Sequence, residues 1–311
     1  MKRQEGSHFR GFRSFDNWHE FSSVRSRQNL YLCTNADFEE AAPEKWFPIA
    51  ISPALSHPEI VALTSPRRLR IHISHLIHFL DYTTKLEVEI VNEAVALMVH
   101  GSLSRYFNSS DHQIALKLYT DEGYHALFSR QQADQVSNHF RIERHDALRI
   151  RLLVQFIEQC PESMRDLSVF LVAFVSETVI TKELALLNRQ AIVPPVFAML
   201  RDHLSDEARH SIFFAASFVK LISKLTEVEQ SFAVDALSKI ITLFYCPDSP
   251  FLRSLLADCP TACARLLTDL EQPASRRGCD IASLTLETIK HTGLLASARH
   301  VQLFKERGLL G

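Results

Sequence analysis

Two short stretches of this chain carry a carboxylate and an imidazole at helical spacing. The pattern Asp-Glu-x-x-His occurs at residues 121–125 and again at residues 206–210. Residues three apart on a helix lie on the same face, so the Glu and the His of each stretch project together. Such a pair can bind a metal ion, and two pairs suit a two-metal site inside a helical bundle.

A further glutamate precedes each motif. In the first half of the chain there are three candidates, Glu87, Glu89 and Glu93. On a helix Glu87 falls on an apolar face, whereas Glu89 falls on a polar face, where we expect it to meet water and pair with Lys85. A buried carboxylate is costly unless a cation or hydrogen-bond donors compensate it. Glu87 is therefore favoured over Glu89 as the metal ligand.

The second half of the chain repeats this pattern. Glu177 lies within the apolar run 169–180, which leaves it little polar surface. Downstream, His203, Glu207 and His210 are spaced i, i+4 and i+7, which places all three on one helix face. Both motifs, both upstream glutamates and this additional histidine together are far more specific than either motif alone.

The ligand types indicate which metal such a site binds. Glutamate and histidine without a thiolate favour first-row ions such as iron or manganese. The chain has six cysteines but no Cys-x-x-Cys pair, which argues against a structural zinc site of the cysteine type. Asp121 and Asp206 directly precede the ligand glutamates. We expect each to hold an imidazole of the opposite helix through an N–H···carboxylate bond, the alternative being a surface charge.

The sequence defines substrate contacts less well than metal ligands. Helical proximity to the predicted ligands suggests four pocket-lining candidates, each of which also fits an ordinary core position: Tyr82, Phe174, Thr181 and Phe197. His72, His75 and His78 recur every three residues. Because they precede the acidic stretch by several turns, we do not expect them to be ligands.

With these residues in hand, the sequence resembles the p-aminobenzoate N-oxygenase (AurF-like) family of di-iron enzymes over residues 67–225. The likeness rests on residues 83–92, 120–125 and 176–178 and on the pattern His203-x3-Glu207-x2-His210. Most ferritin-like di-iron oxidases use two histidines, whereas this family uses three, and His203 stands where the third belongs. The chain departs from the family at Glu93, where members often carry proline. The resemblance implies seven metal ligands: Glu87, Glu122, His125, Glu177, His203, Glu207 and His210.

The resemblance also implies an activity. Such enzymes are non-haem di-iron monooxygenases that use two iron ions, O2 as co-substrate and an external electron donor such as a reductase. We therefore expect an N-oxygenase that oxidises a small-molecule amine to the hydroxylamine, nitroso or nitro level, in natural-product biosynthesis. Two alternatives stay open: a ferritin-like di-iron C–H hydroxylase or desaturase, and a non-enzymatic iron-binding bundle.

The elements that must position these residues are helices. Only eight glycines occur in 311 residues, and alternating strand-like segments are lacking. We predict an all-α protein with a ferritin-like helical bundle. Its helices are expected at residues 67–99, 109–135, 146–159, 163–187 and 194–225. Three or four more are expected after residue 225, with an exposed loop at 273–277.

The domain organisation follows from this arrangement. Pro and aromatic residues punctuate residues 1–65, which we predict to be an irregular arm that packs on the bundle and carries no visible chemistry. Residues 66–311 are predicted to form one di-iron oxygenase domain. Its core is expected at 67–225, and the helices of 226–311 are expected to pack on it and to form a homodimer.

Charge and hydropathy exclude several partners. The net charge is −2, without the basic excess typical of a nucleic-acid-binding protein. No apolar run reaches the roughly 18 residues of a membrane span. The N-terminus lacks the apolar core of a secretory signal. We therefore expect a cytoplasmic protein that binds neither nucleic acid nor membrane.

Overall fold

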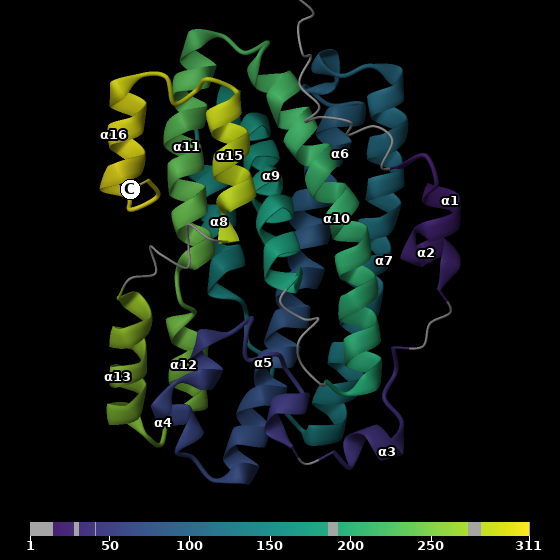
Figure 1. Ribbon diagram of the computed structural model, residues 1–311, viewed down its shortest axis with the longest axis vertical. Coiled ribbons are helices and arrows are strands. Elements are labelled where there is room, and N and C mark those ends of the chain that lie inside the picture. The colour runs from purple at the N-terminus through teal and green to yellow at the C-terminus, as the bar shows by residue number, and fades with distance from the viewer. Residues whose placement is uncertain (1–14, 28–30, 41, 186–191, 273–280, 311) are drawn as a thin grey trace, which may run out of the picture.

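The computed structural model describes residues 15–27, 31–40, 42–185, 192–272 and 281–310. Within these ranges the regular elements are helices and no strand occurs, so the prediction of an all-α protein is confirmed. The longest helices run side by side along the long axis of the molecule, and shorter helices lie around them (Figure 1).

The first bundle helix is continuous but changes type near its centre. It consists of α5 (Ser65–Leu86), the π-helical turn η4 (Glu87–Val91) and α6 (Asn92–Val99), where we predicted one uninterrupted helix. Pro66 occupies the first turn of α5, where its missing N–H removes no hydrogen bond. Single π-helical turns are rare in proteins, but many of those that occur lie at functional sites. Here the turn begins at Glu87, the predicted ligand.

The second bundle helix is α7 (Ser109–Phe140). Its N-cap is Asn108, one residue before the predicted Ser109. The Asn108 side chain accepts a hydrogen bond from the Asp111 N–H, and the Asp111 carboxylate accepts one from the Asn108 N–H. This capping box satisfies two donors that would otherwise be free at the helix start. The helix extends beyond its predicted end and stops at Arg141, which has a left-handed φ of 51°.

Four further helices build the centre of the molecule: α8 (Leu148–Gln159), α9 (Arg165–Leu184), α10 (Pro194–Ile222) and α11 (Glu227–Tyr245). The end of the helix predicted at 163–187 lies outside the described residues. In α9, all six side chains from Phe170 to Val175 are fully buried. A helix that is apolar on every side belongs in the interior. Accordingly, α9 lies between α10 and α11 (Figure 1).

The described residues of the C-terminal part add four more short helices: α12 (Ser249–Leu255), α13 (Pro260–Glu271), α15 (Ser283–His291) and α16 (Ala298–Glu306). With α11, the described residues after 225 therefore hold five helices, more than the three or four predicted. Pro250 and Pro260 each stand in the first turn of a separate helix, which explains the additional division. The loop predicted at 273–277 lies outside the described residues.

Within its described residues, the N-terminal arm contains six short helices: α1 (Trp18–Phe21), α2 (Ser23–Ser26), α3 (Asn35–Phe38), η2 (Pro43–Lys45), η3 (Pro53–Ser56) and α4 (Pro58–Val61). Of these, α1 and α2 lie beside α7 at one edge of the bundle (Figure 1). Trp18 and Trp46 are buried. The division into this arm and one oxygenase domain stays a prediction.

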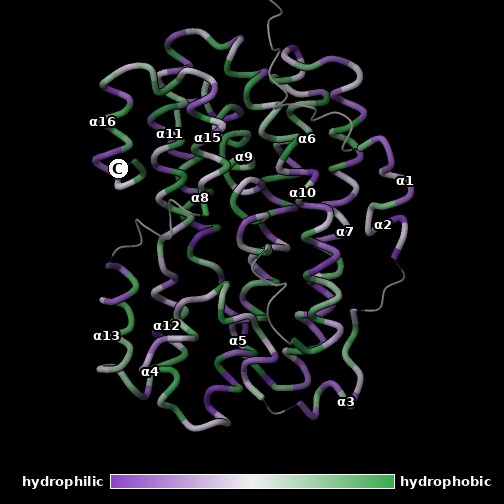
Figure 2. The backbone as a smooth tube through the Cα atoms, in the orientation of Figure 1, coloured by the Kyte–Doolittle hydropathy of each residue, from purple (hydrophilic) through white to green (hydrophobic). Residues whose placement is uncertain are grey.

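Hydrophobic and hydrophilic segments recur along each bundle helix (Figure 2), as expected where one face of each helix packs in the core. Among the described residues, no helix is both long enough and apolar enough to cross a bilayer. The core also contains carboxylates and imidazoles, most of which lie on η4, α7, α9 and α10. These buried polar groups are the unusual feature of the fold.

Candidate metal centre

Four bundle elements bring the seven predicted ligands together. All seven residues are at most 4% exposed. They are Glu87 on η4, Glu122 and His125 on α7, Glu177 on α9, and His203, Glu207 and His210 on α10. The helices place these groups in the interior, where charge is costly unless it is compensated.

The two upstream glutamates differ in burial. Glu87 is 4% exposed, whereas Glu89 is exposed, as predicted from helical spacing. The expected partner of Glu89 was wrong: the Lys85 Nζ lies 2.5 Å from an Asp146 carboxylate oxygen. Asp146 belongs to the segment between α7 and α8, so the pairing depends on tertiary packing that helical spacing does not describe.

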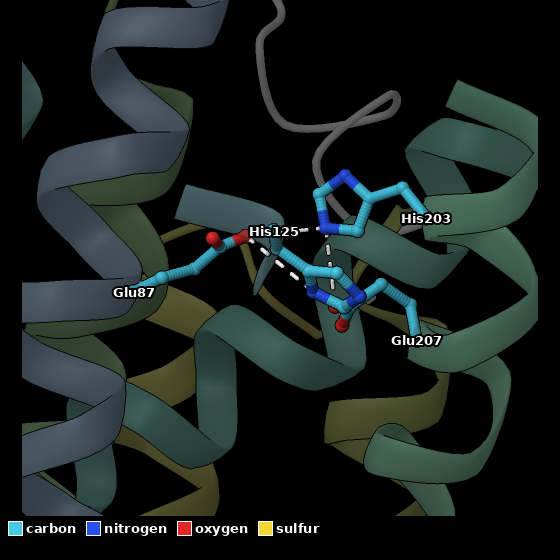
Figure 3. Close-up of side chains that lie close together, drawn as sticks. All are labelled: Glu87, His125, His203 and Glu207. Atoms are coloured by element: carbon cyan, nitrogen blue, oxygen red, sulfur yellow. Dashed lines mark ion pairs between the residues drawn. The ribbon is translucent and has the colours of Figure 1, made fainter. Parts of the chain in front are cut away.

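The first of two potential metal-binding groups consists of Glu87, His125, His203 and Glu207 (Figure 3). The His203 Nε2 lies 3.1 Å from an oxygen of Glu87 and 3.1 Å from an oxygen of Glu207. The His125 Nδ1 lies 3.2 Å from the same Glu207 oxygen. One ligand atom from each side chain lies within 4.8 Å of all the others. Three helical elements, η4, α7 and α10, therefore place these four side chains next to one another.

The second group consists of Glu122, His125, Glu207 and His210. The His210 Nδ1 lies 2.6 Å from Glu122 and 3.3 Å from Glu207. Glu177 belongs to neither group, but its Oε2 lies 3.7 Å from the His210 Nδ1. The two groups share His125 and Glu207, so two ions held by them would be neighbours.

The donor atoms fit metal ions. Six of the seven side chains, all except His125, carry at least one buried atom that makes no hydrogen bond. Such atoms are rare in folded proteins unless a water or an ion occupies the site. Four carboxylates and three imidazoles without a thiolate suit first-row ions. The arrangement therefore matches two adjacent cations that use oxygen and nitrogen ligands.

Burial and crowding perturb the titration of these groups. Burial raises the pKa of Glu87 to about 7. Burial, together with the neighbouring carboxylate charges, raises the pKa of Glu177 well above its usual value. Burial disfavours charge on His125 and His210, but the carboxylates around them outweigh it and raise the pKa of both imidazoles well above the usual value. Cations that enter the cluster must displace protons.

Asp121 and Asp206 contact the imidazoles of the opposite helix. The His125 Nε2 on α7 lies 3.2 Å from Asp206 on α10, and the His210 Nε2 on α10 lies 3.2 Å from Asp121 on α7. Since a carboxylate only accepts, each Nε2–H donates, which leaves Nδ1 as the nitrogen that faces the cluster. Burial would raise the pKa of Asp206, but the bond from His125 and the imidazole charges lower it below its usual value.

Sequence reasoning missed a set of contacts made by the N-terminal arm. The Trp18 Nε1–H donates to both carboxylate oxygens of Asp121, at 3.0 and 2.8 Å, and the Ser22 hydroxyl donates to Asp121 at 2.5 Å. The backbone N–H of Ser23 donates to Asp206 at 3.2 Å. Tryptophan and serine in an irregular polar arm have no periodicity, so the sequence carried no signal for these contacts.

The candidate pocket residues lie in different surroundings. Tyr82 lines a cavity of about 350 Å³ together with His75, His78 and Phe79 from the same face of α5. Glu87 follows Tyr82 by five residues, which in a regular helix is a rotation of about 140°. The cavity therefore lies on a different side of α5 from the cluster of carboxylates and imidazoles.

The other three candidates are part of the packed interior. Phe174 is fully buried and stacks on Phe218, with ring centroids 4.1 Å apart. The Thr181 hydroxyl donates to the backbone carbonyls of Glu177 and Glu207, at 3.0 Å each, and so links α9 to α10 beside the cluster. Phe197 is half-buried at the start of α10.

The α5 histidines, which we did not expect to be ligands, contact other groups. The His75 Nδ1 lies 3.4 Å from the Ser52 hydroxyl of the arm. The His78 Nε2 lies 3.1 Å from an Asp248 oxygen, and its ring stacks on Phe251 at 4.0 Å between centroids. Their regular spacing reflects one helix face that packs against the arm and α12.

Comparison with known proteins agrees with this geometry. The family described as "P-aminobenzoate N-oxygenase AurF" matches residues 34–278. A similar protein is the 4-aminobenzoate N-oxygenase of Streptomyces thioluteus, which is 25% identical over 219 residues, 67% of this chain. The chain spans 63% of that protein's length. The ferritin-like bundle is the fold of this family, and the chain belongs to the p-aminobenzoate N-oxygenase (AurF) family.

Proposed function

We propose that this protein is a non-haem di-iron N-oxygenase that uses O2 and an external electron donor to oxidise an amine nitrogen. The observation that carries the proposal is the buried set of four glutamates and three histidines on four helices. A site with only two histidines would fit many ferritin-like oxidases equally well. His203, one turn before the second motif, supplies the third imidazole and lies 3.1 Å from Glu87 and Glu207.

The chain's own residues would hold the ions, and the carboxylates among them would compensate the positive charge. His125 and His210 would bind through Nδ1, and His203 through Nε2, since these atoms face the carboxylates. Asp206 and Asp121 hold the opposite nitrogens of His125 and His210. Two iron ions, when bound, would supply the electrons and the coordination positions at which O2 is activated. The burial of every ligand keeps bulk water out of the centre.

The substrate that we propose is an aryl amine of the aminobenzoate class. The family description and the name of the Streptomyces relative support this choice. Oxidation would proceed to the hydroxylamine, nitroso or nitro level. The homodimer, the reductase partner and a role in natural-product biosynthesis remain predictions from the sequence.

The proposal is tested by loading the protein with Fe2+ without oxygen, adding 4-aminobenzoate or an aliphatic amine, and exposing the mixture to ¹⁸O2. We expect two iron ions per chain and ¹⁸O on the nitrogen of an aryl amine, detected by mass spectrometry. The Glu207→Gln variant, which lacks a carboxylate shared by both groups, should give no product. Label on carbon would favour a C–H hydroxylase, and a protein that takes up no iron would exclude both enzymes.

A further inference from the structure

We infer that the arm segment Trp18–Ser26 is part of the metal centre, in which it sets the position of two ligand imidazoles through Asp121 and Asp206. Trp18, Ser22 and Ser23 are positioning residues in this role, because they touch the aspartates and not the metal ligands. The inference rests on the proposed di-iron centre. The segment precedes residue 34, where the match to the family begins.

Asp121 is held from two sides. On one side it accepts the Nε2–H of His210 at 3.2 Å. On the other it accepts the Trp18 Nε1–H at both oxygens and the Ser22 hydroxyl at 2.5 Å. Asp121 and Ser22 are fully buried, and Trp18 is 7% exposed. Bonds from neutral donors to a buried carboxylate are strong and directional, so the arm determines where the carboxylate can meet His210.

Asp206 is held by the next residue of the same segment. The Ser23 backbone N–H donates to it at 3.2 Å, and Arg209 pairs with it on the same helix. Asp206 in turn accepts the Nε2–H of His125 at 3.2 Å. Ser22 and Ser23 are adjacent, so a single turn of the arm contacts the partners of both imidazoles, one on α7 and one on α10.

Two further contacts anchor this part of the arm on the cluster. The ring of Phe15 lies parallel to the His210 ring, with centroids 6.0 Å apart and an interplanar angle of 7°. The Lys117 ammonium on α7 donates to the Phe15 carbonyl at 3.1 Å. The arm therefore packs against the His210 ring as well as holding Asp121.

Partners of ligating histidines influence metal affinity because they fix the orientation and basicity of the imidazole. Loss of the Trp18 N–H leaves the Asp121 carboxylate less constrained and His210 less well oriented. The consequence should appear in metal binding itself, before any oxygen chemistry takes place. Co2+ is a suitable probe, since it uses the same ligands as Fe2+, does not need O2, and reports its coordination by visible absorption.

The test compares Trp18→Phe, which keeps a ring but lacks the N–H, with Ser22→Ala and with the control Tyr31→Phe. Tyr31 is a matched control because its hydroxyl donates at 3.0 Å to Asp202, another buried α10 carboxylate, which contacts Arg27 and Arg201. Co2+ affinity is measured by competition with a chelator. Urea unfolding of the metal-free proteins establishes that each variant is folded.

We expect Trp18→Phe and Ser22→Ala to bind Co2+ about tenfold more weakly than wild type, which is the lower end of the range for residues that hydrogen-bond directly to metal ligands. The absorption bands of the bound Co2+ should shift in both variants. Tyr31→Phe should keep the wild-type affinity and spectrum. The inference is overturned if Trp18→Phe retains both, or if Tyr31→Phe weakens binding equally. A wild-type protein that binds neither Co2+ nor Fe2+ would instead overturn the proposed di-iron centre.

Discussion

The Nε2 atom of His125 lies 3.2 Å from Oδ2 of Asp206 on the opposite helix. The reciprocal pair, His210 and Asp121, has the same separation of 3.2 Å. Each Asp-Glu-x-x-His motif therefore supplies the carboxylate that orients the imidazole of the other motif. This arrangement gives the aspartate that precedes the predicted ligand glutamate in each motif a structural role, and it links the two helices at the candidate metal centre.

Replacing Asp206 by Asn should weaken metal binding by about 10- to 100-fold, because the charge that orients His125 is lost. The measurement is Co2+ or Fe2+ affinity by competition with a chelator at fixed pH. Asp202→Asn, on the same helix and also buried, serves as the control and should bind with wild-type affinity. Equal affinity of wild type and Asp206→Asn would show that the contact only supports packing.

Metal content should separate the two groups of ligands. His203 belongs only to the first group, and His210 only to the second, whereas Glu207 belongs to both. We therefore expect iron content after dialysis to fall from two ions to about one in His203→Ala and in His210→Ala, and to less than one in Glu207→Gln. Elemental analysis measures this directly. Loss of both ions in every variant would indicate that the ions bind as one cooperative unit.

Glu177→Gln should have opposite effects on the metal-free and the metal-loaded protein. Burial and neighbouring carboxylates raise the pKa of Glu177 well above its usual value, so folding without a metal requires the protein to bury a carboxyl group whose ionised form is disfavoured. The amide avoids this requirement, and we expect the free energy of unfolding without metal to rise by about 1–3 kcal/mol. With Fe2+ or Co2+ present, the variant should gain less stability than wild type.

Urea unfolding with a chelator and with added metal measures both effects of Glu177→Gln. The exposed Glu89 provides the matched control, and Glu89→Gln should change the free energy of unfolding by less than about 0.5 kcal/mol. If Glu177→Gln destabilised the metal-free protein, Glu177 would have to be stabilised by groups other than a metal.

His75 should make the protein sensitive to acid. Burial, followed by the charges of His78 and His72, lowers the pKa of His75 to about 3. Between pH 6.5 and 3 the unfolded chain therefore binds a proton that the folded protein does not, so stability falls as the pH falls. The loss from this group is at most about 1.4 kcal/mol per pH unit.

The His75→Phe variant should show a weaker decrease of the free energy of unfolding between pH 6.5 and 4.5 than wild type. Urea titrations at several pH values measure the difference. His19, which is exposed, gives the control His19→Phe, for which we expect the wild-type pH dependence. Parallel pH curves for wild type and His75→Phe would show that protonation of His75 does not limit stability.

Helical periodicity was sufficient to predict much of the fold and of the candidate centre. It identified the bundle helices and distinguished the buried Glu87 from the exposed Glu89. It also grouped His203, Glu207 and His210 on one face. These predictions depend only on which residues of one helix project together, and that property is determined by 3.6 residues per turn. Where the regular helix changes to the π-helical turn at Glu87, periodicity gave no warning.

The sequence by itself therefore determined which side chains each helix turns inward and which metal chemistry they suit. Only the tertiary structure decided which aspartate on one helix pairs with which imidazole on the other, as Asp206 does with His125, and which part of the arm contacts these aspartates. Trp18 and Ser22 reach Asp121 from a segment about 100 residues away. Contacts of this kind depend on how separate elements pack, and packing between elements has no period in the sequence.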